Sequence, residues 1–452
     1  MIKKQFWICA ALALIGVLTA CELGGGLLPP VKPPKTAGAI RLVGLPNASQ
    51  TVRIVDVDYD TVDTYQWLKV KGGKDEVIPG VTGNTLTLSV FDIGSQIKAR
   101  VTLKDGAGVI TSPEITVKAP VTRELLASVY PDSGSASGIA VDSSGNIYVV
   151  AQWRENRIVK VSPNGATVTA FAGPSAYNGS DDWGTYAEGA LGTARFAAPM
   201  GLAIDAADVL YVADKDTARI RKVSTAGVVS TLAGTGTQGH TDGAVASAEF
   251  HKPKRVAVDP SGNVYVGRDE GAPTNGVYVS KIDVSAGQKA FLAGSTSQQL
   301  TEAESQAGTY VTGSGASVRF KTINSIVADS SGNLLVADAE GRRIRKINTA
   351  TGATTSFVGD GNGTNKDGNG EQATMNGPSQ MAFGRNGILY VTVEWANDPE
   401  RLRGVTPEGD TFTVSFSDGV SMPAGNAMTS DSDGNLYVLV NGRDIYKITI
   451  PR

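Results

Sequence analysis

The sequence contains very little cysteine and histidine. Among 452 residues there are two cysteines, Cys9 and Cys21, and two histidines, His240 and His251. Since both cysteines precede residue 22, the rest of the chain has no thiol for disulfides, thiolate metal sites or cysteine catalysis. A zinc site usually needs three or four histidine, cysteine or carboxylate ligands, so two histidines without a cysteine give it weak support.

An excess of charge of one sign is also missing. The 41 lysines and arginines nearly balance the 44 aspartates and glutamates, for a net charge of -3. The basic stripe of a nucleic-acid-binding protein is lacking, so we expect no nucleic-acid partner. Aromatic residues make up 6% and glycines number 54, and apolar residues are interleaved with turn residues instead of recurring at helical spacing. This pattern predicts an all-β chain with many tight turns.

A long hydrophobic run is the third absence. The apolar run from Phe6 to Ala20 follows two lysines and is too short for a comfortable membrane span, so residues 1–20 are predicted to be a secretory signal peptide. The run ends in Leu18-Thr19-Ala20-Cys21, which resembles the bacterial lipobox. The resemblance implies cleavage before Cys21 and acyl chains on this residue, which anchor a protein stably in a membrane. An ordinary signal peptide with a chance cysteine is the alternative.

Residues 21–38 are the expected tether. They contain a glycine run and two Pro-Pro pairs, which cannot pack a core and favour an extended, semi-rigid linker. Glu22 follows the cysteine, and by resemblance to lipoprotein sorting the absence of aspartate there permits the outer membrane of a two-membrane bacterium. We therefore expect a lipid-anchored protein of the bacterial cell envelope, at the cell surface.

Residues 39–119 have the strand spacing of a β-sandwich around a central Trp67. The run Tyr65-Gln66-Trp67, followed by Ile78-Pro79-Gly80-Val81-Thr82, resembles the bacterial Ig-like modules of surface proteins, without the core cysteines of antibody domains. This resemblance implies an Ig-like sandwich that serves as a spacer or an adhesive unit. A Ca²⁺ site formed by Asp56, Asp58, Asp60 and Asp63 is the less favoured reading, because aspartates at alternate positions usually form a solvated strand face. The expected strands are AIRLVG, TVRIVDVDY, YQWLKV, TLTLSV, QIKARVTL and VITSPEITVK.

Between residues 121 and 452 one sequence motif recurs six times. In its clearest copy the strands GLAID, VLYVAD, RIRKV and VVSTLAG follow one another between residues 201 and 234. Repeats of about 40 residues with four strands each predict propeller blades. The motif resembles the NHL repeat, which implies a six-bladed β-propeller after the Ig-like domain. The sixth copy lacks a fourth strand, and residues 121–130 are expected to supply it and to close the ring.

The two faces of the expected propeller differ in loop length. The turns between strands one and two and between strands three and four are tight, whereas the other connections hold nearly all the extra residues. Insertions on one face of a repeat architecture indicate a binding face, although they can also be merely tolerated surface length. We call this side the loop face and the opposite side the short-turn face. The loop face comprises residues 152–156, 174–198, 235–252, 268–276, 295–322, 360–377 and 393–400.

Aromatic residues occur in these long loops. Rings on a rigid scaffold can stack on sugars or anchor a protein partner, although each ring can also simply pin its own loop. The expected partner-binding residues are Trp153, Tyr177, Trp183, Tyr186, Arg268, Tyr310 and Trp395.

Two other repeated features are expected to be architectural, because a residue that serves every blade is first of all structural. Large apolar residues of the inter-blade loops should plug each loop into a blade junction, and arginines that begin third strands should bond nearby carboxylates or carbonyls. The first set is Phe196, Phe250, Phe320 and Met375, and the second is Arg157, Arg219 and Arg343.

Metal candidates are few. Propeller lactonases hold Ca²⁺ at the central tunnel with carboxylates and asparagine, and the amidating lyase with an NHL-like propeller has a histidine-rich centre. This chain departs from both, because only two of its second strands end in a carboxylate, Asp214 and Asp338. These two residues and His240 are the weak metal candidates, with Ca²⁺ as the one cofactor considered. The alternative for the aspartates is pairing with Arg219 and Arg343.

The function expected from these features is non-enzymatic recognition of a glycan or a protein by the loop face. Short sequence motifs such as that of a nucleophile elbow or a phosphate-binding loop are missing from the sequence. The alternatives are a metal-dependent hydrolase or lyase acting at the mouth of the propeller tunnel, and a structural scaffold of an envelope complex. Nothing in the sequence indicates an oligomeric state.

Overall fold

The computed structural model describes residues 40–451 except 49, 56–61, 72, 90–91, 105–107, 130–134, 153–154, 176–185, 269–275, 297–311, 395–401, 419–421 and 423–424. Strands dominate the described residues, and the named helices are the short 3-10 turns η4 (Gly370–Gln372) and η5 (Arg385–Gly387). The prediction of an all-β chain is confirmed. Within the described part of the chain, no helix is long and apolar enough to cross a membrane.

Six antiparallel sheets, which we number 1 to 6 in chain order, make up the larger part of the molecule. In each, the second strand is fully buried or nearly so, as its run of Val, Ile, Leu and Tyr requires. Sheets 1 and 2 are β10 (Ser135–Val141), β11 (Ile147–Gln152), β12 (Arg157–Val161) and β13 (Val168–Ala172), then β14 (Pro199–Ile204), β15 (Leu210–Asp214), β16 (Arg219–Val223) and β17 (Val229–Ala233). Sheet 3 is β18 (Gly243–Ala244), β22 (Gln288–Gly294), β21 (Tyr278–Asp283), β20 (Val264–Arg268) and β19 (Arg255–Val258). Sheet 4 is β23 (Gly313–Ser314), β27 (Ala353–Val358), β26 (Arg343–Ile347), β25 (Leu334–Asp338) and β24 (Ser325–Ala328). Sheet 5 is β28 (Pro378–Phe383), β29 (Leu389–Val393), β30 (Leu402–Val405) and β31 (Thr411–Thr413), and sheet 6 is β32 (Gly425–Ser430), β33 (Leu436–Val440), β34 (Asp444–Thr449) and β9 (Thr122–Ser128).

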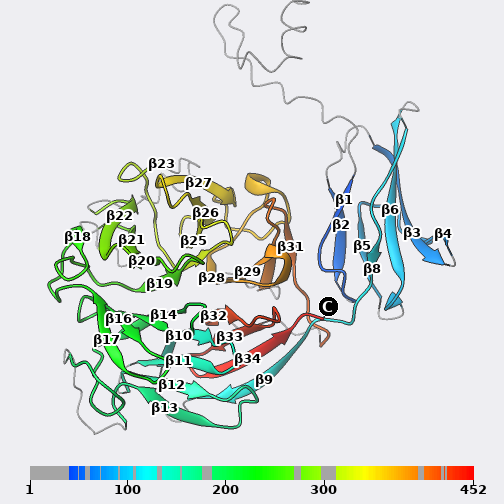
Figure 1. Ribbon diagram of the computed structural model, residues 1–452. Helices are drawn as coiled ribbons and strands as arrows, with labels where there is room; N and C mark the ends of the chain where they lie inside the picture. Colours follow the sequence, from blue (N-terminus) through cyan, green and yellow to red (C-terminus); the bar gives the residue numbers. More distant parts are fainter. Residues whose placement is uncertain are drawn as a thin grey trace, which may run out of the picture.

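The six sheets are arranged in a ring (Figure 1). The first strand of each sheet contacts the first strand of the next, in the order β10, β14, β19, β24, β28 and β32, and β32 contacts β10. Apolar side chains from neighbouring sheets form the cores between them; one such core joins Tyr148 of sheet 1 to Leu202 and Val212 of sheet 2. Each sheet therefore buries its faces against two neighbours, as in a β-propeller.

Strand β9 lies at the outer edge of sheet 6. It pairs with β34 in antiparallel register, with Ala127 opposite Ile445 and Arg123 opposite Ile448. This is the position in which the sequence analysis places residues 121–130. The pairing joins a segment that precedes sheet 1 to the last strand of the chain, so the first and last sheets are linked by backbone hydrogen bonds as well as by side chains.

Two smaller sheets precede the ring. One contains β1 (Arg41–Val43), β2 (Thr51–Val55) and β5 (Thr85–Thr87), and the other contains β4 (Lys74–Val77), β3 (Val62–Lys71), β6 (Gln96–Leu103), β7 (Val109–Thr111) and β8 (Ile115–Thr116). Trp67 is completely buried between them, and its indole Nε1 donates to the Gly83 carbonyl at 3.0 Å. The core is centred on Trp67, as expected. The segment VITSPEITVK forms two strands rather than one, because Pro113 has no N–H to donate to a ladder.

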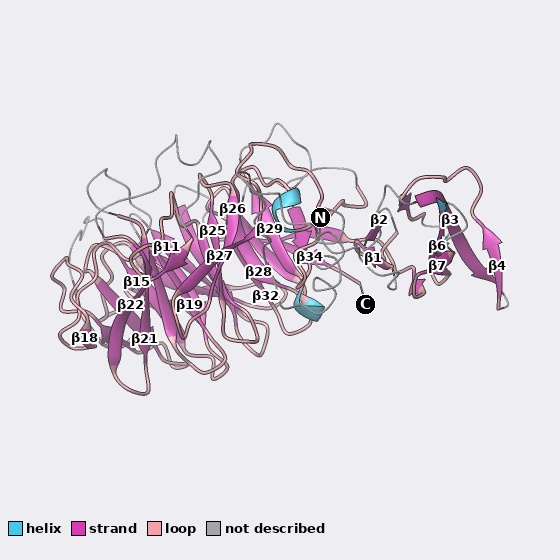
Figure 2. Cartoon of the chain, turned by 90° about the horizontal axis from the view of Figure 1, so that it is seen from above, coloured by secondary structure: helices cyan, strands magenta, loops and turns pink. Residues whose placement is uncertain are grey.

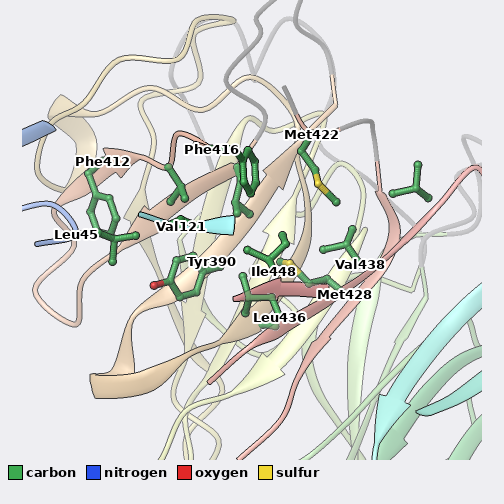
Figure 3. Packing of buried hydrophobic residues seen from close by; sticks show 14 of the residues in the cluster. Leu45, Val121, Tyr390, Phe412, Phe416, Met422, Met428, Leu436, Val438 and Ile448 are labelled. Carbon is green, nitrogen blue, oxygen red and sulfur yellow. The ribbon is translucent and has the colours of Figure 1, made fainter. Parts of the chain in front are cut away.

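The smaller sheets pack against the ring at sheets 5 and 6. Leu45 belongs to one buried cluster with Phe412, Val121 and Met428, and Figure 3 shows these side chains converging. Polar contacts surround the cluster: Arg41 pairs with Asp410 at 3.0 Å, and the amide of Gln50 bonds the backbone of Ser415. Figure 2 shows the smaller sheets at one end of the ring.

Candidate binding site at the channel mouth

The first strands of the six sheets surround a central channel, which contains a cavity of about 250 Å³. Apolar residues such as Ile139, Leu202 and Met381 line much of it. Polar side chains stand where first strands begin, at the end of the channel that opens on the loop face. They are Ser137, Arg255, Asn324 and Gln380.

A hydrogen-bonded group occupies one side of this mouth. Glu394 follows β29, and its carboxylate accepts hydrogen bonds from the Asn324 amide at 3.3 Å and from the Ser379 hydroxyl at 2.5 Å. The Gln380 amide donates to Ser379 Oγ at 3.3 Å and to the Asn324 carbonyl at 3.5 Å. Sheets 4 and 5 thus hold two amides, a hydroxyl and a carboxylate in one cluster, in which Ser379 and Gln380 are buried and Asn324 and Glu394 are partly exposed.

Other polar residues of the mouth bond to neighbouring sheets. Gln152 Nε2 donates to the Pro199 carbonyl at 3.0 Å, and Ser137 Oγ donates to the Met200 carbonyl at 2.8 Å. Arg255 Nε donates to the Ile323 carbonyl at 3.5 Å. The mouth therefore combines hydroxyl, amide, guanidinium and carboxylate groups, which can bind polyols and peptide groups.

The sequence analysis missed these mouth residues. A sequence signal exists for Arg255 and Gln380, because the aligned copies of the repeat in sheets 1 and 2 have Gly138 and Gly201 at this position. A Cβ at Gly201 would stand 2.7 Å from the Lys254 carbonyl oxygen, so the backbone of sheet 3 comes too close for a side chain. Sheets 3, 4 and 5 have larger residues there, Arg255, Ser325 and Gln380, and all three line the channel cavity.

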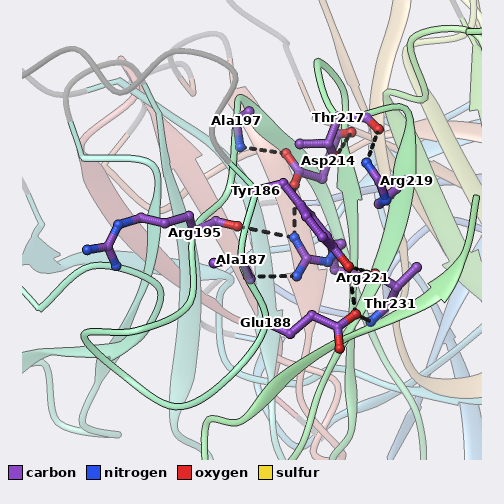
Figure 4. Close-up of polar contacts among 10 residues, drawn as sticks. All are labelled: Tyr186, Ala187, Glu188, Arg195, Ala197, Asp214, Thr217, Arg219, Arg221 and Thr231. Carbon is purple, nitrogen blue, oxygen red and sulfur yellow. Dashed lines mark hydrogen bonds and ion pairs between the residues drawn. The ribbon is translucent and has the colours of Figure 1, made fainter. Parts of the chain in front are cut away.

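Tyr186, one of the expected partner-binding residues, stabilises its own loop (Figure 4). Its ring lies over the guanidinium groups of Arg219 and Arg221, at 4.1 and 4.6 Å, and its hydroxyl bonds Glu188 at 2.8 Å. Hydrogen bonds from Tyr186 and Thr231 hold the pKa of Glu188 below its usual range. Tyr186 is 41% exposed, so part of the residue is open to solvent.

Asp214 forms a buried ion pair, but with a different arginine from the one expected. Arg221 Nη1 lies 3.3 Å from Asp214 Oδ2, both side chains are completely buried, and the Ala197 amide donates to Asp214 Oδ1 at 2.9 Å. Burial raises the pKa of Asp214 to about 6 against the opposing charge of Arg221. Arg219 instead donates to the carbonyl oxygens of Thr217 and Thr235, and Thr235 begins the inter-blade loop of residues 235–252.

Asp338 of sheet 4 repeats this arrangement. Its partner is Arg345, at 3.8 Å, and backbone amides of Lys321 and Thr322 donate to the carboxylate. Arg343, the partner expected from the sequence, donates to the Asp360 carbonyl. The expected pairing of Asp214 with Arg219 is therefore corrected, and for Asp338 the charge of Arg345 acts beside that of Arg343. Each aspartate joins an inter-blade loop to its sheet. Its buried arginine partner lies in the third strand, two residues after the arginine that begins this strand.

His240 lies in the loop that precedes β18, and Arg268 is the last residue of β20, opposite Tyr278 in the register of sheet 3. His240 Nδ1 is 3.0 Å from the Tyr278 hydroxyl, and its ring stacks on that of His251 at 5.7 Å. Burial lowers the pKa of His240, and the charge of Arg268 acts in the same direction. Arg268 is 2% exposed and donates to the Gly276 carbonyl at 2.7 Å, so it is a buried residue of this cluster.

The architectural expectations are confirmed. The apolar loop residues Phe196, Phe250, Phe320 and Met375 are all buried in cores between sheets. The arginines that begin third strands bond carbonyl oxygens: Arg157 donates to Ser175, Arg219 to Thr235 and Arg343 to Asp360.

Several expected site residues lie outside the described residues. They are Cys21, Trp153, Tyr177, Trp183, Tyr310 and Trp395. Among the residues that are described, no three His, Cys, Asp or Glu side chains are grouped closely enough to hold a metal ion.

Comparisons with known proteins concern the fold. The family model of the teneurin NHL domain matches residues 81–224. A protein of unknown function from Bacteroides thetaiotaomicron has a similar structure, with a TM-score of 0.50 and 13% identity over 91% of this chain and 98% of that chain. An auxiliary nutrient binding protein from the same organism has a TM-score of 0.49 and 12% identity, and one from Bacteroides ovatus has 0.48 and 16%; each comparison covers 91% of this chain and 98% of the other. No curated protein matches the sequence. The ring of sheets is that of a β-propeller, and the NHL match over residues 81–224 supports an NHL-type propeller.

Proposed function

We propose that this protein is a lipid-anchored component of the bacterial cell envelope whose propeller binds a glycan or a protein on the loop face without transforming it. The observation that carries this proposal is the polar cluster of Asn324, Ser379, Gln380 and Glu394 at the channel mouth. Amide and carboxylate groups held rigidly on strand ends offer the paired donors and acceptors that sugar hydroxyls and peptide groups require. A glycan fits this chemistry best.

The domain organisation belongs to the same proposal. Residues 1–20 are a signal peptide, 21–38 a tether anchored through Cys21, 39–119 an Ig-like sandwich, and 121–452 a six-bladed propeller whose last blade is completed by 121–130. The six sheets in ring order and the core around Trp67 support the two folded parts. Incorporation of labelled fatty acid into the native chain, and its loss in Cys21→Ser, tests the anchor.

A screen against bacterial glycans and envelope proteins tests the binding function. We expect Asn324→Ala to weaken binding by about tenfold or more, since a lost hydrogen bond to a charged group is worth about 1.5–3 kcal/mol. Ser144→Ala, on the exposed short-turn face, is the matched control and should bind normally. Trp153→Ala with Trp395→Ala should abolish binding if the loop aromatics form part of the same surface. A folded Asn324→Ala variant with native affinity would refute the site.

One observation favours a second function, a hydrolase or lyase. Glu394 places a carboxylate beside the hydroxyl of Ser379 at the channel mouth, a position from which it can exchange protons with a bound ligand. Turnover of a ligand found in the screen, abolished by Glu394→Gln with binding retained, would establish this alternative. Binding without turnover supports recognition alone.

A further inference from the structure

The sheets share a structural rule on the short-turn face. An aspartate after the first strand accepts a hydrogen bond from the hydroxyl of a tyrosine in the second strand. The pairs are Tyr148 with Asp142 at 3.1 Å, Tyr211 with Asp205 at 2.9 Å, Tyr265 with Asp259 at 2.9 Å and Tyr437 with Asp431 at 3.2 Å. Each of these rings packs in the core between its own sheet and the next.

Two sheets depart from this rule. In sheet 4, Leu335 stands where the other sheets have tyrosine, while the aspartate remains as Asp329. In sheet 5, Gly384 stands where the other sheets have aspartate. A Cβ at Gly384 would lie 2.5 Å from the ring of Tyr390, so no side chain of sheet 5 extends from this position. The departure in sheet 4 therefore removes a tyrosine ring from the junction between sheets 4 and 5, whereas the Tyr390 ring of sheet 5 packs in the core with sheet 6.

A pocket of about 380 Å³ lies at this junction. Its apolar walls include Leu335, Phe357, Phe383 and Leu389, and Asp329 and Lys346 lie on its polar side. Its volume is within the range of about 300–1,000 Å³ that is usual for small-molecule sites. The pocket lies on the short-turn face, away from the candidate site at the channel mouth.

The contacts of Lys346 also differ from those of the lysines at the same position in other sheets. In sheets 1 and 6 the corresponding lysines lie over the tyrosine rings, Lys160 over Tyr148 at 5.5 Å and Lys447 over Tyr437 at 5.8 Å. Lys346 has no such tyrosine in its own sheet, and it lies 5.8 Å from the Phe357 ring and 3.4 Å from the Asp329 carboxylate.

The Asp329 carboxylate is a suitable acceptor. Burial, which raises the pKa of Asp329, is outweighed by hydrogen bonds from Asn333 and by the charge of Lys346, so this pKa lies below its usual value. The group is therefore ionised at neutral pH, and a hydrogen bond to an ionised acceptor is stronger than one to a neutral acceptor.

We propose that the pocket between sheets 4 and 5 binds a para-hydroxyphenyl group. The ring occupies the apolar space between Leu335, Phe357 and Phe383, and the hydroxyl donates to Asp329. The ligand thus takes the place of the tyrosine that the other junctions carry. The group can come from a free small phenol or from a tyrosine side chain of a peptide.

Titration of the full chain with 4-methylphenol, followed by NMR and calorimetry, tests the proposal. We expect saturable binding of one molecule, and about tenfold weaker binding of toluene, which lacks the hydroxyl. Binding of N-acetyl-tyrosinamide would identify a peptide tyrosine as the source, and its failure to bind beside 4-methylphenol would identify a free phenol. Equal affinities for 4-methylphenol and toluene, or no saturation with either, would overturn the proposal.

Two variants and one direct measurement locate the site. Leu335→Tyr restores the rule of the other sheets and should abolish 4-methylphenol binding. Tyr211→Leu, the matched variant at the junction of sheets 2 and 3, keeps Asp205 and should add a second site. In the native protein, we expect nuclear Overhauser effects from the 4-methylphenol methyl group to Leu335 and Leu389. This measurement does not depend on whether a variant folds. Native affinity in folded Leu335→Tyr, or contacts to other residues only, would contradict the assignment.

Discussion

At the scale of single residues, the loop face is stabilised by buried charges. Arg221 is completely buried, pairs with Asp214, and also donates to the Arg195 and Ala187 carbonyls at 3.1 and 3.0 Å. Burial lowers the pKa of Arg221, and the charge of Asp214 opposes this shift. The ion pair therefore holds the inter-blade loop against its sheet. It contributes to stability only when both partners are present.

We expect Arg221→Met to lower the free energy of unfolding by about 3–5 kcal/mol, because it leaves the Asp214 carboxylate buried without its partner. Chemical denaturation at pH 7 measures this loss. The double variant with Asp214→Leu should recover part of it. Arg385→Met is the matched control: its ion pair with Asp433 is exposed, so the loss should stay below about 1 kcal/mol.

His240 makes stability depend on pH. Because burial lowers the pKa of His240 below 6.5, the unfolded chain binds more protons than the folded chain as the pH falls through that value. The contribution of His240 to stability is thus present above pH 6.5 and is lost as the pH falls toward the folded pKa. Groups facing it include Arg268, His251, Lys289 and Glu249. Denaturation midpoints at pH 7.5 and 5.5 should differ less in His240→Gln than in the native protein; an identical difference would assign the effect elsewhere.

At the scale of elements, the repeated phrase predicted the strands of the ring well, because alternating apolar residues bounded by turns are a local property. VLYVAD and RIRKV appear as β15 and β16. The two-residue strands β18 and β23, which add an outer strand to sheets 3 and 4, were not predicted. They lie within inter-blade loops and are too short to show a period. Strand β4, which extends β3 into a hairpin, was also missed, because its KDEV sequence is fully exposed.

Deletion of residues 121–130 should destabilise the entire ring. It removes β9, exposes the edge of β34 and takes the buried side chains of Val121 and Ala127 out of two inter-sheet cores. Thermal unfolding measures the effect, with a loss of about 3 kcal/mol or more from the lost burial. A synthetic peptide of these residues added in trans should restore part of the stability. Unchanged thermal unfolding after the deletion would show that sheet 6 does not need β9.

At the scale of the whole molecule, the amino-terminal sheets and the ring share a core. Leu45 packs with Phe412 and Val121, and Arg41 pairs with Asp410 across the contact (Figure 3). The sequence analysis interpreted the amino-terminal domain as a spacer or an adhesive unit, and nothing local in β1 or β2 indicates that their side chains meet sheet 5. The shared core implies that the two parts unfold together.

We expect Leu45→Asp to uncouple them. A charge in this buried cluster cannot be solvated unless the contact opens, so calorimetry should resolve two transitions where the native protein shows one. Small-angle scattering should also show a more extended particle. Val77→Asp, at an exposed position of β4, is the control and should behave like the native protein. One transition in a folded Leu45→Asp variant would mean that the polar contacts alone join the two parts.

The sequence by itself determined the all-β class, the repeat of four strands and the structural role of the loop plugs, because each follows from residue order over a few tens of positions. The tertiary structure decided which side chains meet. It paired Asp214 with Arg221, assembled Asn324, Ser379 and Glu394 at the channel mouth, and brought Leu335 and Gly384 to the wall of one pocket. The physical reason is that a strand pattern specifies which face of a strand is buried, whereas the neighbour across a sheet junction is specified by how the ring closes.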